Sequence, residues 1–316
     1  MPEKKIIAVV GATGAQGGGV AHAILADPSG EFRVRALTRD VNSAKAKALA
    51  AAGAEVVAAD VDDEASVAKA FEGAYGAYCV TFFWDHMSPS REVTQGSNMA
   101  RAAKTAGLKH VVWSTLEDVR RFVPLDDDRM PTLQGKYKVP HFDAKSEVDH
   151  VFTDLGVPTT FLYASFYWDN FIYFGAGPKR GPDGTLALTM PTGSAKVAGV
   201  ASEDIGKVAY GIFKQGASTI GQKIGVGGEL LTAAEMASAI GAAIGQKVVF
   251  NDVPPDVYRS FGFPGADDLG NMFQFYRDFE RACNEMRDVA RAKTYAKDLS
   301  SFKSWLESNA SKIPLD

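Results

Sequence analysis

Three side chains of this chain could act together on a polar bond: a serine hydroxyl, a histidine imidazole and a lysine ammonium. Ser114 ends an apolar segment, and His141 and Lys145 lie four residues apart in a stretch that predicts a helix. That spacing places His141 and Lys145 on one helical face. Imidazole can exchange a proton near neutral pH, but an adjacent ammonium opposes its protonation. We therefore predict that Lys145 binds a cofactor, the alternative being a surface lysine. For His141, a hydrogen bond to substrate or loop is favoured over direct catalysis.

A glycine-rich segment near the start of the chain predicts a phosphate-binding turn. Gly11, Gly14 and Gly17 follow the apolar run at residues 6–10 and precede a helical pattern that begins at Val20. Strand, tight turn and helix would direct free helical N–H groups at a pyrophosphate. The spacing is not the commoner G-x-G-x-x-G, so the prediction depends on the position of the loop after a strand. The alternative is a glycine-rich loop that binds nothing.

Arg39 predicts which dinucleotide would bind. It ends a second predicted strand at residues 32–38, roughly twenty residues after the last glycine of the loop. Domains that bind NAD usually place an acidic side chain there, on the ribose 2′-hydroxyl. The planar, permanently charged guanidinium of an arginine suits a 2′-phosphate instead. We therefore predict NADP(H) over NAD(H), the alternative being a solvated arginine at a strand end.

Alternating strands and helices must position these groups. The patterns predict strands at residues 6–10, 32–38, 55–59, 77–84, 109–115 and 159–163, with helices between them. This alternation predicts an α/β fold with a doubly wound parallel sheet of the Rossmann type. We assign residues 1–163 to this domain and residues 164–316 to a smaller, interleaved α+β domain that walls the cleft. Segments near residues 196–227 are expected to return to the first domain.

Two irregular segments flank the predicted site. Residues 117–139 contain Arg120-Arg121, Asp126-Asp127-Asp128 and Lys136-Tyr137-Lys138. We interpret them as a long surface excursion with solvated charges, and loops of this length are usually functional or mobile. Tyr137 is a second candidate proton donor, or else a tyrosine that covers the cleft mouth. The second segment, residues 166–174, is aromatic, and we expect it to stack near a nicotinamide, to pack in the core between the two units, or both.

Composition narrows the class of protein. The chain has 316 residues, 46% hydrophobic and 23% charged, with a net charge of −4, which favours neither nucleic acid nor an anionic membrane. Its two cysteines fit a reducing compartment, and its five histidines are scattered, so we expect no metal. Neither a secretory signal nor an apolar run of bilayer length is present. We expect a cytoplasmic protein, with nuclear entry and a homodimer left open.

Several motifs together resemble the NmrA-like family. They are Gly11 to Gly18, Thr38-Arg39, Asp60 to Asp63, Val93 to Gly96 and Val139 to Lys145. The segment Gly262 to Leu269, with Asn271-Met272-Phe273, is similar more narrowly to the HSCARG branch. The resemblance covers essentially the whole chain. It implies an atypical short-chain dehydrogenase/reductase that binds NADP(H) but lacks the catalytic tyrosine, which is replaced here by His141.

The resemblance also implies which residues contact the cofactor. By position they are Gly11, Ala12, Thr13, Gly14, Ala15, Gln16, Gly17, Arg39, Ser43, Asp60, Val61, Thr81, Phe82, Phe83, Thr94, Lys145, Tyr167, Trp168, Asp169 and Asn170. The family often has a basic residue at the position of Ser43 and a lysine at that of Thr94, so less charge would compensate the phosphate. The excursion at residues 122–139 is longer than in the vertebrate form, which implies a lid or a different partner surface.

Two functions and a third, simpler class follow from these features. The first is an NADP(H)-binding redox sensor that couples the NADPH/NADP ratio to a protein partner, as the resemblance implies. The second is an NADPH-dependent reductase of a small carbonyl, quinone or enone, with Ser114, His141 or Tyr137 as donors. The third is a scaffold whose nucleotide site is vestigial. Turnover of NADPH separates the first two, and absence of NADPH binding would indicate the third.

Overall fold

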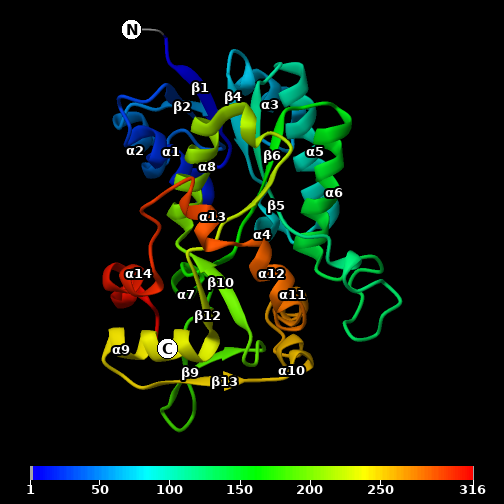
Figure 1. Ribbon diagram of the computed structural model, residues 1–316, viewed down its shortest axis with the longest axis vertical. Coiled ribbons are helices and arrows are strands. Elements are labelled where there is room, and N and C mark those ends of the chain that lie inside the picture. Colours follow the sequence, from blue (N-terminus) through cyan, green and yellow to red (C-terminus); the bar gives the residue numbers. More distant parts are fainter. Residues whose placement is uncertain (1–2, 316) are drawn as a thin grey trace.

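The computed structural model describes residues 3–315, and its larger part is a seven-stranded, wholly parallel sheet (Figure 1). The strands are β1 (Lys5–Val9), β2 (Phe32–Thr38), β3 (Glu55–Ala58), β4 (Gly76–Cys79), β5 (His110–Thr115), β6 (Thr159–Tyr163) and β11 (Lys223–Gly225). Their order is β11-β6-β5-β4-β1-β2-β3. This order reverses between β1 and β4, and doubly wound sheets bind ligands at the carboxyl ends of the strands at such a point. The predicted fold class is confirmed.

Helices cover both faces of this sheet (Figure 1). On one side lie α1 (Ala15–Leu25), α2 (Ala44–Ala51) and α8 (Ser202–Gln215), and on the other α3 (Glu64–Phe71), α5 (Pro89–Thr105) and α6 (Pro140–Asp154). Helices α1 and α8 cross in close contact, because a Cβ atom on Gly206 would lie only 2.0 Å from the carbonyl carbon of Gly19. Strands covered on both faces are apolar throughout, and β4 and β5 are fully buried accordingly.

The smaller part of the molecule lies below the main sheet in Figure 1. It contains two three-stranded sheets, β12-β10-β7 and β13-β9-β8. Their strands are β7 (Phe166–Tyr167), β8 (Lys179–Arg180), β9 (Leu186–Met190), β10 (Lys196–Val200), β12 (Glu229–Thr232) and β13 (Val248–Asp252). The helices of this part are α7 (Asn170–Tyr173), α9 (Ala233–Ile244), α10 (Pro255–Arg259), α11 (Ala266–Asp278), α12 (Glu280–Met286), α13 (Val289–Lys293) and α14 (Phe302–Asn309). Three short 3-10 turns, η1 (Val119–Arg121), η2 (Gly216–Thr219) and η3 (Ala310–Lys312), complete the elements.

The chain passes between the two parts more than once. Residues 196–200 form β10 in a smaller sheet, whereas α8 packs on α1 and β11 joins the edge of the main sheet. The predicted return near residues 196–227 therefore comes from α8 and β11. The domain boundaries themselves stay a prediction. No helix within residues 3–315 is long and apolar enough to cross a membrane.

One predicted element is wrong in its second half. The apolar run at residues 77–84 predicts one strand, but β4 ends at Cys79 and residues Phe83–His86 form a short helix, α4. The aromatic side chains explain the turn. Phe83 is buried, and the ring of Trp84 lies 4.9 Å from His141 and 5.6 Å from Phe174. These contacts with other elements outweigh the local preference of aromatic residues for a strand.

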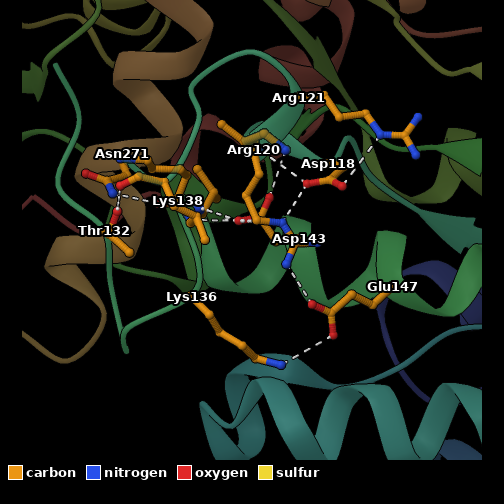
Figure 2. A network of polar contacts seen from close by, with 12 residues as sticks. Asp118, Arg120, Arg121, Thr132, Lys136, Lys138, Asp143, Glu147 and Asn271 are labelled. Carbon is orange, nitrogen blue, oxygen red and sulfur yellow. Dashed lines mark hydrogen bonds and ion pairs between the residues drawn. The ribbon is translucent and has the colours of Figure 1, made fainter. Parts of the chain in front are cut away.

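The excursion after β5 is anchored at its base by Asp143 of α6 (Figure 2). One oxygen of this buried carboxylate accepts the backbone N–H of Val119 at 2.8 Å. The other accepts those of Lys138 and Val139 at 2.7 and 3.0 Å. Burial raises the pKa of Asp143 to about 6, although these N–H groups and the charge of Arg120 oppose the shift. A single side chain therefore ties both ends of the excursion to α6.

The predicted solvation of the charged excursion is wrong for two of its residues. Lys138 is 1% exposed, and its ammonium donates to the carbonyl oxygens of Asp127 and Met130 at 2.8 and 2.6 Å. Arg120 is half-buried and lies 2.7 Å from Glu147. Neighbouring Arg121 is 77% exposed, as predicted. A short sequence motif could not reveal the buried cations, because their partners are backbone carbonyls and a side chain of another element.

The middle of the excursion is held to the smaller part of the molecule. The Asn271 amide on α11 donates to the carbonyl oxygens of Pro131 and Lys138 at 2.9 and 2.6 Å (Figure 2). Gln274, one turn further along α11, donates to the carbonyl of Arg129 at 2.7 Å. The excursion thus bridges α6 and α11.

Candidate functional site

The glycine loop after β1 has the geometry of a phosphate cradle. Gly11 has a φ of +63°, which disfavours residues with a side chain. A Cβ atom on Gly11 would lie 2.8 Å from the Phe82 ring, and one on Gly17 would lie 2.4 Å from the Gly11 carbonyl oxygen. Helix α1 begins at Ala15, and within residues 3–315 no side chain caps its N-terminus. Its first N–H groups are therefore available to an anion.

Four of the predicted cofactor residues meet at a small cavity of about 60 Å³ beside this loop. Its lining residues are Arg39, Asp60, Val61, Asp62, Phe82, Asp85, His86, Arg91 and Gln95. The side chain of Arg39 is 66% exposed. It lies 2.9 Å from the carboxylate of Asp85, and its guanidinium is 5.8 Å from the Phe82 ring centre. Because Arg39 is exposed, its guanidinium can exchange the Asp85 carboxylate for a phosphate.

Acidic side chains on the same cavity are already paired. Asp62 accepts hydrogen bonds from Arg91 and from Gln95, both at 3.0 Å. The hydrogen bond from Arg91 lowers the pKa of Asp62 to about 2. The Asp60 carboxylate accepts the backbone N–H of Asp62 at 3.0 Å. Asp62 is therefore compensated by Arg91, whereas Arg39 is paired with Asp85 of α4.

Several predicted cofactor residues have other partners in the fold. Ser43 caps α2 through the Ala46 N–H, and Thr94 donates to the Ser90 carbonyl on its own helix. Asp169 accepts the Ser202 N–H at 2.8 Å. Trp168 is fully buried, with its ring 5.2 Å from Phe302 and 6.3 Å from Trp305. The Trp168 ring thus lies in the core of the smaller part, the alternative that the aromatic segment left open.

A cluster of hydroxyl groups surrounds the amide of Gln16. The Ser114 hydroxyl, at the end of β5, donates to the Gln16 carbonyl oxygen at 2.8 Å. The Tyr78 hydroxyl donates to the same oxygen, and the Gln16 amide nitrogen donates to the Tyr167 hydroxyl. Burial raises the pKa of Tyr78 and of Tyr167 well above its ordinary value, so both phenols stay protonated. Tyr78 did not stand out in the sequence because it sits within a buried strand.

Lys145 makes a buried ion pair that the sequence did not predict. Its ammonium lies 2.8 Å from the Glu92 carboxylate on α5, and the side chains are 9% and 0% exposed. The Thr81 hydroxyl, just after β4, is hydrogen-bonded to both groups. Burial alone would raise the pKa of Glu92, but the charge of Lys145 and the hydrogen bonds hold it below its usual value. A glutamate within the buried stripe Glu92, Gln95, Gly96 and Met99 of α5 was the signal in the sequence.

His141 is fixed by a carboxylate from a distant segment. Its Nδ1 atom lies 2.5 Å from the Asp268 carboxylate at the start of α11, and its backbone N–H donates to the other oxygen at 3.1 Å. Both residues are buried. Asp268 belongs to the motif at residues 262–269, but its partner could not be identified from the sequence because 127 positions separate the two residues.

The three catalytic candidates do not form one connected group. Within residues 3–315 no hydrogen bond joins Ser114 to His141, because each has its own partner. Tyr137 is 3% exposed, with Arg120 at 5.7 Å and Lys136 at 4.9 Å from its ring centre. The same range contains no cluster of three or more side chains suited to a metal ion. What the arrangement offers is a nucleotide cradle with separate polar groups around its far end.

Comparison with known proteins agrees with this architecture. The model of the NmrA-like family matches residues 3–306. A relative from Cladobotryum sp., the NmrA-like family domain-containing oxidoreductase FrzB, is 30% identical over 289 residues, which cover 85% of this chain and 83% of FrzB.

Two solved structures share the fold. NmrA, a negative transcriptional regulator solved in complex with NADP, has a TM-score of 0.78 and 23% identity, covering 98% of this chain and 96% of that one. The triphenylmethane reductase of Citrobacter sp., solved with NADP(H), has a TM-score of 0.73 and 20% identity, covering 97% and 99%. One neighbour is thus a regulator and the other a reductase.

Proposed function

Because this chain belongs to the NmrA-like family, we propose that it binds NADP(H) and acts as a redox sensor or regulator, coupling nucleotide binding to conformation and to a protein partner. The proposal includes a cytoplasmic location, with nuclear entry open, and a second copy of the chain as one candidate partner. The cofactor residues remain those that the sequence indicated, with Glu92 added as the partner of Lys145.

The cradle fits NADP(H) at its adenosine end. Gly11 and Gly17 tolerate no Cβ atom, the α1 N-terminus is uncapped among the described residues, and Arg39 lies at the mouth of the adjoining cavity. The glycines and the α1 N-terminus suit a pyrophosphate. Arg39 suits a 2′-phosphate. NADP(H) itself would supply a hydride donor or acceptor at its nicotinamide. The chain's own residues would bind and orient it.

The observation that carries the regulatory role is the Lys145–Glu92 ion pair. In short-chain reductases the equivalent lysine lowers the pKa of the catalytic tyrosine, and that effect requires an uncompensated positive charge. Here the charge is cancelled by a carboxylate 2.8 Å away, and His141 stands in place of the tyrosine. The site therefore keeps the means to hold a nucleotide and lacks the usual means to transfer a proton.

A reductase is the second candidate, and one observation favours it. Hydroxyls from β4, β5 and β7 converge on Gln16, so Tyr78, Ser114 and Tyr167 could bind a carbonyl oxygen if the amide moved aside. FrzB is described as an oxidoreductase, and the Citrobacter neighbour as a reductase. The candidate substrates are small carbonyls, quinones and enones.

NADPH oxidation separates these two functions. The purified chain should bind NADPH yet consume it over a panel of carbonyls, quinones and enones no faster than a protein-free blank does, and Ser114→Ala and His141→Ala should not change that rate. The rate of NADPH oxidation is measured as the loss of NADPH absorbance at 340 nm. Wild-type turnover at least about tenfold above that of either variant would overturn the regulatory role in favour of the reductase.

A further inference from the structure

The Lys145–Glu92 pair lies beside the half of the proposed NADP(H) site that would hold the nicotinamide. The Lys145 ammonium is hydrogen-bonded to the Thr81 hydroxyl at the carboxyl end of β4. Ser114 lies near the end of the neighbouring strand β5. Arg39 follows β2, on the other side of the switch point, and the cavity that it lines extends from there to α4 and α5. A dinucleotide with its 2′-phosphate at Arg39 therefore has its nicotinamide on the β4–β5 side.

Among the described residues, only one oxygen of the Glu92 carboxylate has a hydrogen-bond partner. The Glu92 carboxylate is fully buried and contacts the Lys145 ammonium through one oxygen. Its second oxygen lies 3.5 Å from Nε2 of His86. The Ser88 backbone N–H donates to Nδ1 of His86 at 3.0 Å, so a neutral His86 carries its proton on Nε2, toward Glu92.

Asp149, one turn further along α6 than Lys145, is another charged group in this region. The Lys145 ammonium lies 5.5 Å from the Trp113 ring centre, and the indole N–H of Trp113 donates to Asp149 at 2.9 Å. Burial raises the pKa of Asp149 to about 6. Within residues 3–315, Glu92 is the carboxylate that lies within 4.0 Å of the Lys145 ammonium, and the His141–Asp268 pair lies one turn earlier on α6.

The oxidised nicotinamide ring carries a positive charge, and the reduced ring carries none. A lone lysine ammonium nearby would repel NADP⁺ but not NADPH, and a lone carboxylate would attract NADP⁺. We propose that Glu92 sets the balance between NADP⁺ and NADPH binding by cancelling the charge of Lys145. This inference rests on the proposed binding of NADP(H). Because the two charges cancel, neither redox form is favoured by charge, so a sensor of the NADPH/NADP ratio can bind both.

The test is the ratio of dissociation constants, Kd(NADP⁺)/Kd(NADPH), measured by calorimetric titration of the full chain. With Glu92→Gln at pH 6, the ratio should rise roughly tenfold over wild type at the same pH. With Lys145→Gln at pH 9, the ratio should fall by a similar factor. Tenfold corresponds to about 30 mV in the potential of the bound two-electron couple.

Two controls separate charge from structural damage. The double variant Glu92→Gln/Lys145→Gln leaves neither charge, so its ratio should return to within about twofold of wild type. Glu147→Gln makes the same substitution on the outer part of α6 and should not change the ratio. If Glu92 and Lys145 only supported the structure, replacing them would weaken the binding of both nucleotides equally and leave the ratio constant.

The outcomes also separate the inference from the function beneath it. Shifts of the ratio in the same direction for both single variants, or no shift in either, would overturn the inference while NADP(H) binding stands. If the wild-type chain binds neither NADP⁺ nor NADPH, the proposed function itself fails. Should one single variant not fold, the other still decides, because each has a stated direction.

Discussion

Replacing Arg39 by alanine is expected to weaken NADPH binding about 100-fold and to leave NADH binding within about twofold of wild type. Only NADPH carries the 2′-phosphate. The Arg39 side chain is 66% exposed and is paired with Asp85 across the cavity at the carboxyl end of β2. The phosphate would replace the Asp85 carboxylate as the partner of the guanidinium. Fluorescence titration of both nucleotides measures the two affinities.

Two further variants control this experiment. Arg33→Ala removes an arginine within β2, which pairs with Glu55 at 3.5 Å, and should change neither affinity. Asp85→Asn removes the competing carboxylate and should tighten NADPH binding a few-fold. Equal loss of both nucleotides in Arg39→Ala would show that the arginine supports the fold of the site and does not select the phosphate.

Replacing Arg287 by methionine is expected to lower the free energy of unfolding by about 3–5 kcal/mol, because it leaves the buried charge of Glu117 without a partner. Arg287 is 1% exposed, and its guanidinium lies 2.9 Å from the second carboxylate oxygen of Glu117 in a two-pronged pair. Its Nε also donates to the Ala164 carbonyl at 2.9 Å. Burial alone would lower the pKa of Arg287, but the charge of Glu117 raises this pKa above its usual value.

Urea unfolding of matched variants tests this account of the pair. Arg281→Met removes an arginine whose side chain is 91% exposed and which pairs with Glu285 one turn away, and its unfolding should match that of wild type. The double variant Glu117→Gln/Arg287→Met should recover part of the lost stability, since no lone charge remains. An Arg287→Met protein as stable as Arg281→Met would contradict the account.

Features that depend on neighbours along the chain could be predicted from the sequence. The strands at residues 32–38 and 159–163 have the predicted bounds, because their patterns are local. The parallel, doubly wound class of the main sheet followed from the alternation of strands and helices.

Features that depend on contacts between distant segments could not be predicted. Glu92 and Lys145 lie on different helices, and Asp268 reaches His141 from α11. Strand β10 likewise pairs with β12 and with two residues of β7, which come from other segments of the chain. The site was therefore foreseen as a nucleotide cradle, while the partners that set its charge were not.

Hydrogen exchange of the full chain with and without saturating NADPH tests the central claim most directly. If the chain holds NADP(H) at the carboxyl edge of the main sheet, amides of the glycine loop at residues 11–17 should exchange more slowly with NADPH bound. Residues 38–43 and the segment after β4 at residues 80–83 should show the same protection. Unchanged exchange at all three segments, with NADPH in large excess, would contradict the account.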